Sequence, residues 1–175
     1  MSSLITNYAV DCTKDSIGGI SKMRIANKCD LDPVTPYTVV NGIITGINML
    51  AGKQFYSFNL IKNTSHIAQA LTASEVNGTV FYAQSGTLIL NKLRATTSAL
   101  VDNLARNLLV MIVEDKNGEV VLLGKDNGLD VSGGTITTGT ASGDRNGYEL
   151  QFKGEEKYVS HIDPTIIAGL LIPKV

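Results

Sequence analysis

Alternation of apolar and polar residues predicts strands along most of this chain. Runs rich in Val, Ile, Thr and aromatic residues with a period of two are typical of half-buried strands. The runs that fit are 16–27, 37–50, 54–61, 66–73, 79–90, 108–114, 119–123 and 148–152. The dipeptides Asn77-Gly78 and Asn117-Gly118 predict β-hairpins between neighbouring runs, and Asn41-Gly42 predicts a tight turn.

One segment has a helical period instead. The apolar residues that carry this period are Leu100, Val101, Leu104 and Leu108. They form one stripe along a helix that we expect to run from about Thr97 to Asn107. Thr96 or Thr97 is the expected N-cap.

Two further stretches have little periodicity. Residues 124–143 are rich in Gly, Ser, Thr and Asp, which predicts a long loop or a loosely paired ribbon. Residues 162–175 form an apolar tail that Pro164 and Pro173 interrupt. The sum is one mainly β domain over residues 1–175: an antiparallel β-sandwich or barrel with one short α-helix, extended loops and a C-terminal tail.

The charge of the chain is close to balance, with 15 Lys and Arg against 16 Asp and Glu. Proteins that recognise DNA by sequence present a strongly basic surface, and this balance does not imply one. Charged residues make up only 18% of the chain, against about 25% in an average globular domain. The remaining surface is either a neutral Ser/Thr/Asn-rich surface or a surface for self-association.

The N-terminus shows no targeting pattern. Met1 is followed by no basic region and no long apolar core, so no signal peptide is predicted. The longest apolar run, residues 166–172, is too short to cross a bilayer. We therefore expect a protein made in the cytoplasm, with no membrane partner, in which Cys12 and Cys29 are reduced and buried.

Residues with catalytic or metal-binding chemistry are few and scattered. His66 and His161 are the only histidines, and no Gly-x-Ser-x-Gly motif or Cys-x-x-Cys pair accompanies them. Residues 126–130 resemble half of a calcium loop without the Glu that completes one. The glycines near Gly133 and Gly139 lead into a strand pattern, whereas a phosphate loop leads into a helix. We expect no cofactor, no metal and no enzymatic activity.

Aromatic residues leave one binding function open. Tyr37, Tyr56 and Tyr82 would form a platform for a glycan or a peptide if the fold brought them together. The chain has no Trp, which weakens this alternative.

A series of short motifs also occurs in a definite order along the chain. They are Asp11-Cys12, Ser16-Ile17-Gly18-Gly19-Ile20, Ile25-Ala26-Asn27, Asp115-Lys116-Asn117-Gly118, Gly124 with Gly128-Leu129, Thr138-Gly139, Gly143-Asp144, Asn146-Gly147-Tyr148-Glu149-Leu150 and Gly154-Glu155-Glu156. As an ordered set spanning most of the chain, they resemble structural proteins of tailed bacteriophages, especially small ones from phages of Bacteroidetes.

The resemblance implies a tail tube subunit of the virion. Such a subunit is a β-sandwich or barrel with a flanking helix, and copies of it form rings that stack into a conduit for DNA. Its partners would be copies of itself, other tail or neck proteins, and DNA in transient passage. Neck or connector rings and capsid decoration proteins share this architecture and stay open as alternatives. Sixfold stacked rings would distinguish the tube from them.

Under this resemblance, adaptable segments contact neighbouring subunits and acidic groups line the lumen. The interface candidates are Gly139, Gly143, Asp144, Asn146, Pro33 and Pro36. The lumen candidates are Asp126, Asp130 and Asp144, because an acidic wall repels the phosphates of passing DNA.

Overall fold

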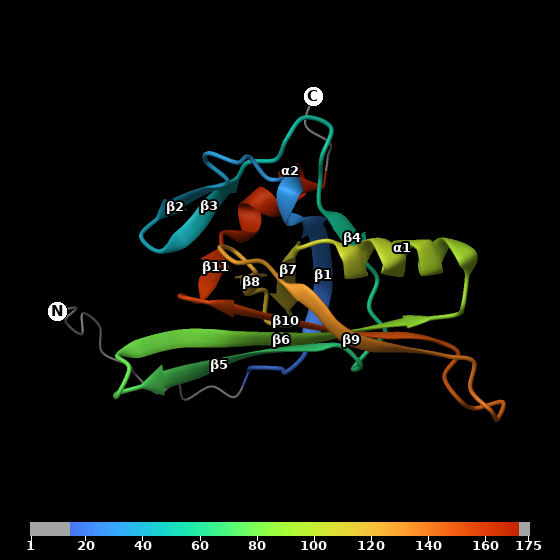
Figure 1. The fold of residues 1–175 in the computed structure, drawn as a ribbon. Coiled ribbons are helices and arrows are strands. Elements are labelled where there is room, and N and C mark those ends of the chain that lie inside the picture. The colour runs from blue at the N-terminus through green and yellow to red at the C-terminus, as the bar shows by residue number, and fades with distance from the viewer. Residues whose placement is uncertain (1–14, 172–175) are drawn as a thin grey trace.

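The computed structural model describes residues 15–171, which form a mainly β fold of two sheets and two short helices (Figure 1). The sheets pack face to face as in a sandwich, and they do not close into a barrel within residues 15–171. The predicted fold class is therefore confirmed in its sandwich form.

The first sheet has seven strands in the order β2-β3-β11-β8-β7-β1-β4. Their bounds are β2 Tyr37–Val40, β3 Ile43–Ile47, β11 Ser160–Ile162, β8 Val120–Leu123, β7 Leu109–Asp115, β1 Ile20–Asn27 and β4 Tyr56–Phe58. The second sheet has four antiparallel strands in the order β5-β6-β10-β9. Their bounds are β5 His66–Ser74, β6 Thr79–Asn91, β10 Gly147–Glu156 and β9 Asp130–Thr137. The helices are α1 Ala95–Arg106 and α2 Ile167–Leu170, with 3₁₀ turns η1 Lys28–Asp30 and η2 Pro164–Ile166.

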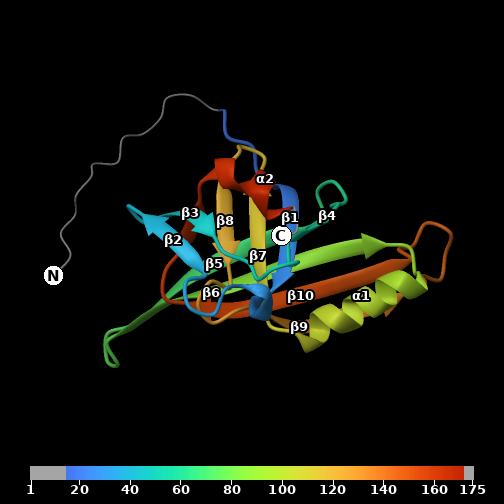
Figure 2. The same cartoon turned by 90° about the horizontal axis from the view of Figure 1, so that it is seen from above.

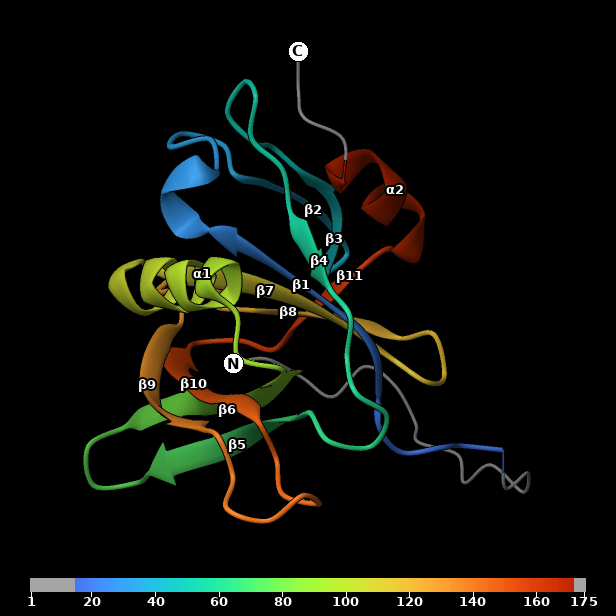
Figure 3. The same ribbon diagram turned by 90° about the vertical axis from the view of Figure 1, so that its right-hand side faces the viewer.

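The two sheets cross at a large angle (Figure 2). The four-stranded sheet therefore extends beyond the seven-stranded sheet at both of its ends. At one end α1 lies over the extension, and its buried side chains Val101 and Leu104 complete the core there (Figure 3).

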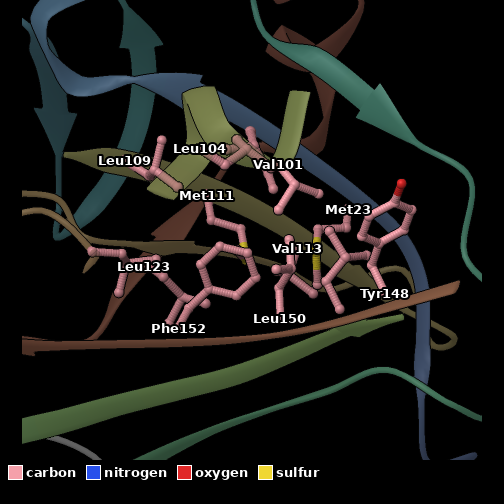
Figure 4. Packing of buried hydrophobic residues seen from close by; sticks show 13 residues of the cluster. Met23, Val101, Leu104, Leu109, Met111, Val113, Leu123, Tyr148, Leu150 and Phe152 are labelled. Carbon is pink, nitrogen blue, oxygen red and sulfur yellow. The ribbon is translucent and has the colours of Figure 1, made fainter. Parts of the chain in front are cut away.

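The seven-stranded sheet is buried on both faces around β7. Leu109, Met111 and Val113 point toward the four-stranded sheet, where they pack with Tyr148, Leu150 and Phe152 of β10 (Figure 4). The alternate residues Val110 and Ile112 point the other way, into a second core with β3 and α2. Burial on both faces explains why β7 is a continuous apolar run without alternation.

Tyr148 fixes the start of α1. Its hydroxyl donates to the Arg94 carbonyl (3.1 Å), accepts from the Arg94 N–H (3.3 Å) and lies 2.6 Å from Oγ of Ser98. The helix begins at Ala95, with Arg94 as an N-cap that makes no side-chain bond. The predicted Thr96 or Thr97 cap is therefore wrong, because the Tyr148 hydroxyl supplies these contacts instead.

One open alternative is resolved and two other predictions need correction. Of the long loop and the paired ribbon expected over 124–143, the structure shows the ribbon, because strand β9 pairs with β10 through seven residue pairs and one bulge. The predicted tail from residue 162 is folded as far as residue 170, where η2 and α2 follow β11; residues 172–175 lie outside the described part. Cys29 is exposed rather than buried, since it lies in η1 at the rim of the sheet, and Cys12 lies outside the described residues.

An ion cluster joins β1 to β7. The carboxylate of Glu114 accepts from Nη2 of Arg24 (3.1 Å) and from Nζ of Lys22 (3.0 Å), and the Arg24 side chain is almost fully buried. Burial raises the pKa of Glu114, but the hydrogen bonds and charges of Lys22 and Arg24 outweigh it, so this pKa is lowered from its usual 4.5.

Replacing Tyr148 by Phe removes the hydroxyl contacts to α1 and leaves the ring in the core. We expect the variant to lose about 1–3 kcal/mol of unfolding free energy, because the Arg94 N–H loses its acceptor, while the Arg94 carbonyl keeps the Ser98 N–H (2.9 Å). Urea denaturation measures this loss. Tyr158→Phe is the matched control, since Tyr158 is 59% exposed, and a loss of equal size there would contradict the assignment.

Because the pKa of Glu114 is lowered in the folded state, its stabilisation is present above the unfolded pKa and is lost as pH falls through the folded pKa. We expect Glu114→Gln to be less stable than wild type at pH 7, with a difference that shrinks below about pH 4.5. Denaturant midpoints between pH 7 and pH 3 test this. Glu119→Gln, at an exposed position nearby, should show no such narrowing.

Candidate interaction surfaces

The four-stranded sheet has two edges without a neighbouring strand. Within residues 15–171, β5 pairs only with β6, and β9 pairs only with β10. Because the sheet has an even number of antiparallel strands, these two edges run in opposite directions. Unpaired edges of nine and eight residues are sites at which another chain can add a strand.

The face of this sheet that points away from the core is mostly small and polar, and Phe81 and Ile89 of β6 are its large apolar residues. Tyr148, Leu150 and Phe152 point inward, so the alternate residues of β10 point outward. The outward residues and their register partners are Glu149, Gln151, Lys153 and Glu155 of β10, Ala83, Ser85, Thr87 and Ile89 of β6, His66, Ala68 and Ala70 of β5, and Asp130, Gly133 and Thr135 of β9. Ile89 is the one large aliphatic residue among them, and it is buried. Its charged groups are three carboxylates against Lys153, and one of these carboxylates, Glu149, is paired with Arg145 (2.7 Å), so the face has a small acidic excess.

One end of the molecule carries seven of the thirteen large exposed apolar side chains of residues 15–171. The β5–β6 turn, the β2–β3 turn and the connection 157–159 all lie at this end (Figures 1 and 2). Its exposed apolar residues are Val39, Val40, Ile43, Leu71, Val76, Val80 and Tyr158. We call this surface the hairpin end.

Leu71 and Val80 are exposed because of the crossing angle. Leu71 pairs with Tyr82, and Val80 pairs with Ala73, on the core-facing side of the sheet. The β2–β3 hairpin of the other sheet lies above this end (Figure 1), but Leu71 and Val80 belong to neither hydrophobic core. Leu71 and Val80 are therefore 61% and 58% exposed, although they occupy core-side positions.

The opposite end holds the 138–146 loop, the 92–94 connection and the start of α1 (Figure 2). We call this surface the loop end. Asp144 accepts from the N–H groups of Thr140 and Ala141, both at 2.8 Å, and these bonds lower the pKa of Asp144. Asn146 bonds to the N–H groups of Lys92 and Leu93. The loop is thus held in a defined shape by its own polar groups.

The predicted interface residues fall in two separate places. Gly139, Gly143, Asp144 and Asn146 all belong to the 138–146 loop. Pro33 and Pro36 line a cavity of about 390 Å³ between η1 and β2, far from that loop in the chain and in the fold. Their contact with a neighbour stays a prediction.

This cavity between η1 and β2 also contains two groups with altered pKa. Burial lowers the pKa of Lys28, and burial together with the nearby carboxylates of Asp126 and Glu156 raises the pKa of Tyr37. The Tyr37 hydroxyl is buried and has no hydrogen-bond partner in the described part of the chain.

The predicted lumen residues do not share one surface. Asp130 points outward beside Lys153, on the acidic outer face. Asp126 lies in the β8–β9 connection, with its carboxylate 3.5 Å from Nζ of Lys125. Asp144 lies beyond the other end of β9. The order of the sequence alone could not reveal that the three aspartates lie on different surfaces. The alternation along β10, in contrast, does predict that the carboxylates Glu149 and Glu155 point outward.

The β8–β9 connection is held by a buried carboxylate. Oε1 of Glu156 accepts from the N–H groups of Asp126 (2.9 Å) and Asn127 (2.8 Å), and Lys28 donates to the carbonyls of Lys125 and Asp126. Glu156 is only 2% exposed. Its position at the end of β10 therefore ties this connection to the four-stranded sheet.

Residues considered for other chemistry lie apart. His66 is on β5 and His161 on β11, in different sheets. Tyr37 and Tyr56 lie on opposite edge strands of one sheet, and Tyr82 lies on the other sheet, so they form no common platform. The described residues contain no group of three or more His, Cys, Asp or Glu side chains that could hold a metal ion. None of the helices in residues 15–171 is long and apolar enough to span a membrane.

Comparison of the chain with protein families, curated proteins and solved structures finds no match.

Glu156→Ala should free the β8–β9 connection. We expect a loss of about 1–3 kcal/mol, because two backbone N–H groups lose a charged acceptor. Urea midpoints measure the loss, and hydrogen exchange should quicken at residues 124–128. Glu155→Ala is the control, since Glu155 is exposed on the neighbouring position; unchanged exchange in Glu156→Ala would contradict this role.

Proposed function

We propose that this chain is a virion structural protein, a tail tube subunit that joins copies of itself into rings that stack into a conduit for DNA. The observation that carries the proposal is the four-stranded sheet, with its two unpaired edges and its small, polar outer face. The ordered motifs that resemble phage tail proteins support a phage tail as the place where this subunit assembles.

The direction of the edge strands suits a ring. When one copy is rotated about an axis along the strands, its β9 arrives antiparallel to β5 of the first copy, because the two edges run in opposite directions. The same contact then repeats around the ring head to tail, and closure leaves no edge of the four-stranded sheet exposed. The four-stranded sheets would form one continuous wall.

The composition of the outer face suits a lumen. In such a ring one face of the continuous sheet lines the passage, and the outer face is the one that the core leaves available. Glu155 and Asp130 would repel DNA phosphates, whereas Glu149 is paired with Arg145, and the Ala, Ser and Thr side chains beside them offer few groups that bind DNA.

A neck or connector ring is the second candidate, because the same edges would close a ring that does not stack. Electron microscopy of the purified protein separates the two: a tube subunit gives stacked rings, and a connector gives single rings. Protein that stays monomeric at high concentration would count against both.

Cysteine cross-linking tests the edge joint itself. In a chain with Cys12 and Cys29 changed to Ser, Ala70→Cys would be combined in turn with Gly133→Cys, Thr135→Cys and Thr137→Cys. All four positions point outward, so the pair nearest in register should oxidise into a ladder of covalent oligomers.

The matched control is Ala70→Cys with Ile136→Cys, because Ile136 points to the opposite side of the sheet. This pair should stay monomeric on denaturing gels. Rings that form by microscopy without any ladder in the three test pairs would show that the joint uses other edges.

A further inference from the structure

The exposed apolar side chains are distributed very unevenly. Seven of the thirteen large ones in the described residues lie at the hairpin end (Figure 1). Single exposed apolar residues need no explanation, but several on one surface mark a site of association. Leu71 and Val80 are the clearest cases, because they occupy core-side positions of the sheet and yet pack into neither core.

We propose that the hairpin end binds the loop end of a second copy of this chain, and that this contact stacks one ring on the next. The inference rests on the ring proposed above. The contact runs along the strands of the four-stranded sheet, at right angles to the edge joint, so the two contacts use different surfaces.

The loop end offers a matching apolar side chain. Ile136 near the end of β9 is 64% exposed. It lies on the core-facing side of the sheet, the side on which Leu71 and Val80 lie at the hairpin end. These exposed apolar side chains can therefore meet when two copies align end to end.

Charge favours the same pairing. The β5–β6 turn carries a single charged residue, Glu75. At the other end of β6, Lys92 and Arg94 are both exposed, and no acidic residue occurs between Glu75 and Asp102. The two ends carry other charges too, since Lys157 is exposed on the 157–159 connection and Asp144 lies in the 138–146 loop. The complementarity is therefore that of the strand pair itself: Glu75 of one copy meets Lys92 and Arg94 of the next when the pairs align end to end.

The 138–146 loop is suited to receive this contact. Asp144 and Asn146 already hold it in one shape, so binding does not have to order it. This order gives a rigid acceptor surface around Ile136.

The first test compares wild type with Leu71→Thr/Val80→Thr by electron microscopy and analytical ultracentrifugation. Thr keeps β propensity and removes apolar contact, so the variant should fold with an unchanged melting temperature and form rings. We expect its ring-to-ring association to weaken at least about tenfold. Val34→Thr is the control, because Val34 is 83% exposed and lies outside the hairpin end.

The second test reverses the charges. Glu75→Lys should weaken stacking about tenfold, and the chain that also carries Lys92→Glu and Arg94→Glu should regain it. Stacking in Glu75→Lys equal to wild type, or failure of the triple variant to regain it, would show that the loop end is not the partner surface.

The outcomes separate this inference from the ring. If the cysteine ladder forms and Leu71→Thr/Val80→Thr stacks as well as wild type, the ring stands and the hairpin-end contact is wrong. If no ladder and no ring form in wild type, the ring itself is wrong. If rings form and only the hairpin-end variants stay unstacked, both hold.

Discussion

The structure depends on the burial of β7 on both faces. Its alternate residues enter two separate cores, one shared with β10 and α1 and the other with β3 and α2. A strand in this position must be apolar throughout, and it requires covering layers on each side. The four-stranded sheet provides one of these layers. Because that sheet crosses β7 at a large angle, its ends cannot be covered by the same strands, and this is the origin of both overhangs (Figure 2).

The two ends of the four-stranded sheet that extend beyond the other sheet are not covered in the same way. At the loop end α1 covers the inner side, and the hydroxyl of Tyr148 fixes where the helix begins. At the hairpin end nothing in the described residues takes the place of α1, and Leu71 and Val80 remain exposed. Because α1 covers one end of the sheet and no comparable element covers the other, the two ends of the subunit differ.

Local sequence patterns predicted the strands well where a strand has one buried face or a strong turn. The hairpins at Asn77-Gly78 and Asn117-Gly118 are examples, since the turn residues and the flanking alternation agree. The sequence did not predict β9 as a regular strand, because Gly133, Gly134 and the threonines around them have no apolar period. The strand forms by pairing with β10, and no local sequence pattern indicates that pairing. The parallel contact between β11 and β3 joins residues more than a hundred positions apart and is invisible for the same reason.

The candidate surfaces were only partly predictable. The alternation of β10 indicates that Glu149 and Glu155 face away from Leu150, so the acidic outer face follows from the sequence. Asp126, Asp130 and Asp144 look alike in the sequence, and the fold separates them because β9 spans the distance between Asp130 and Asp144. The apolar residues of the β5–β6 turn read as ordinary core positions. Only the crossing of the two sheets explains why no other layer packs on the side chains of Leu71 and Val80.

Unlike ends have a consequence for growth. A stack of such subunits would be a polar filament, with hairpins presented at one tip and loops at the other. The two tips would then recruit different caps and could elongate at different rates, so initiation and termination would be chemically distinct events. An organism that needs a tube of fixed length would have to control only one of them.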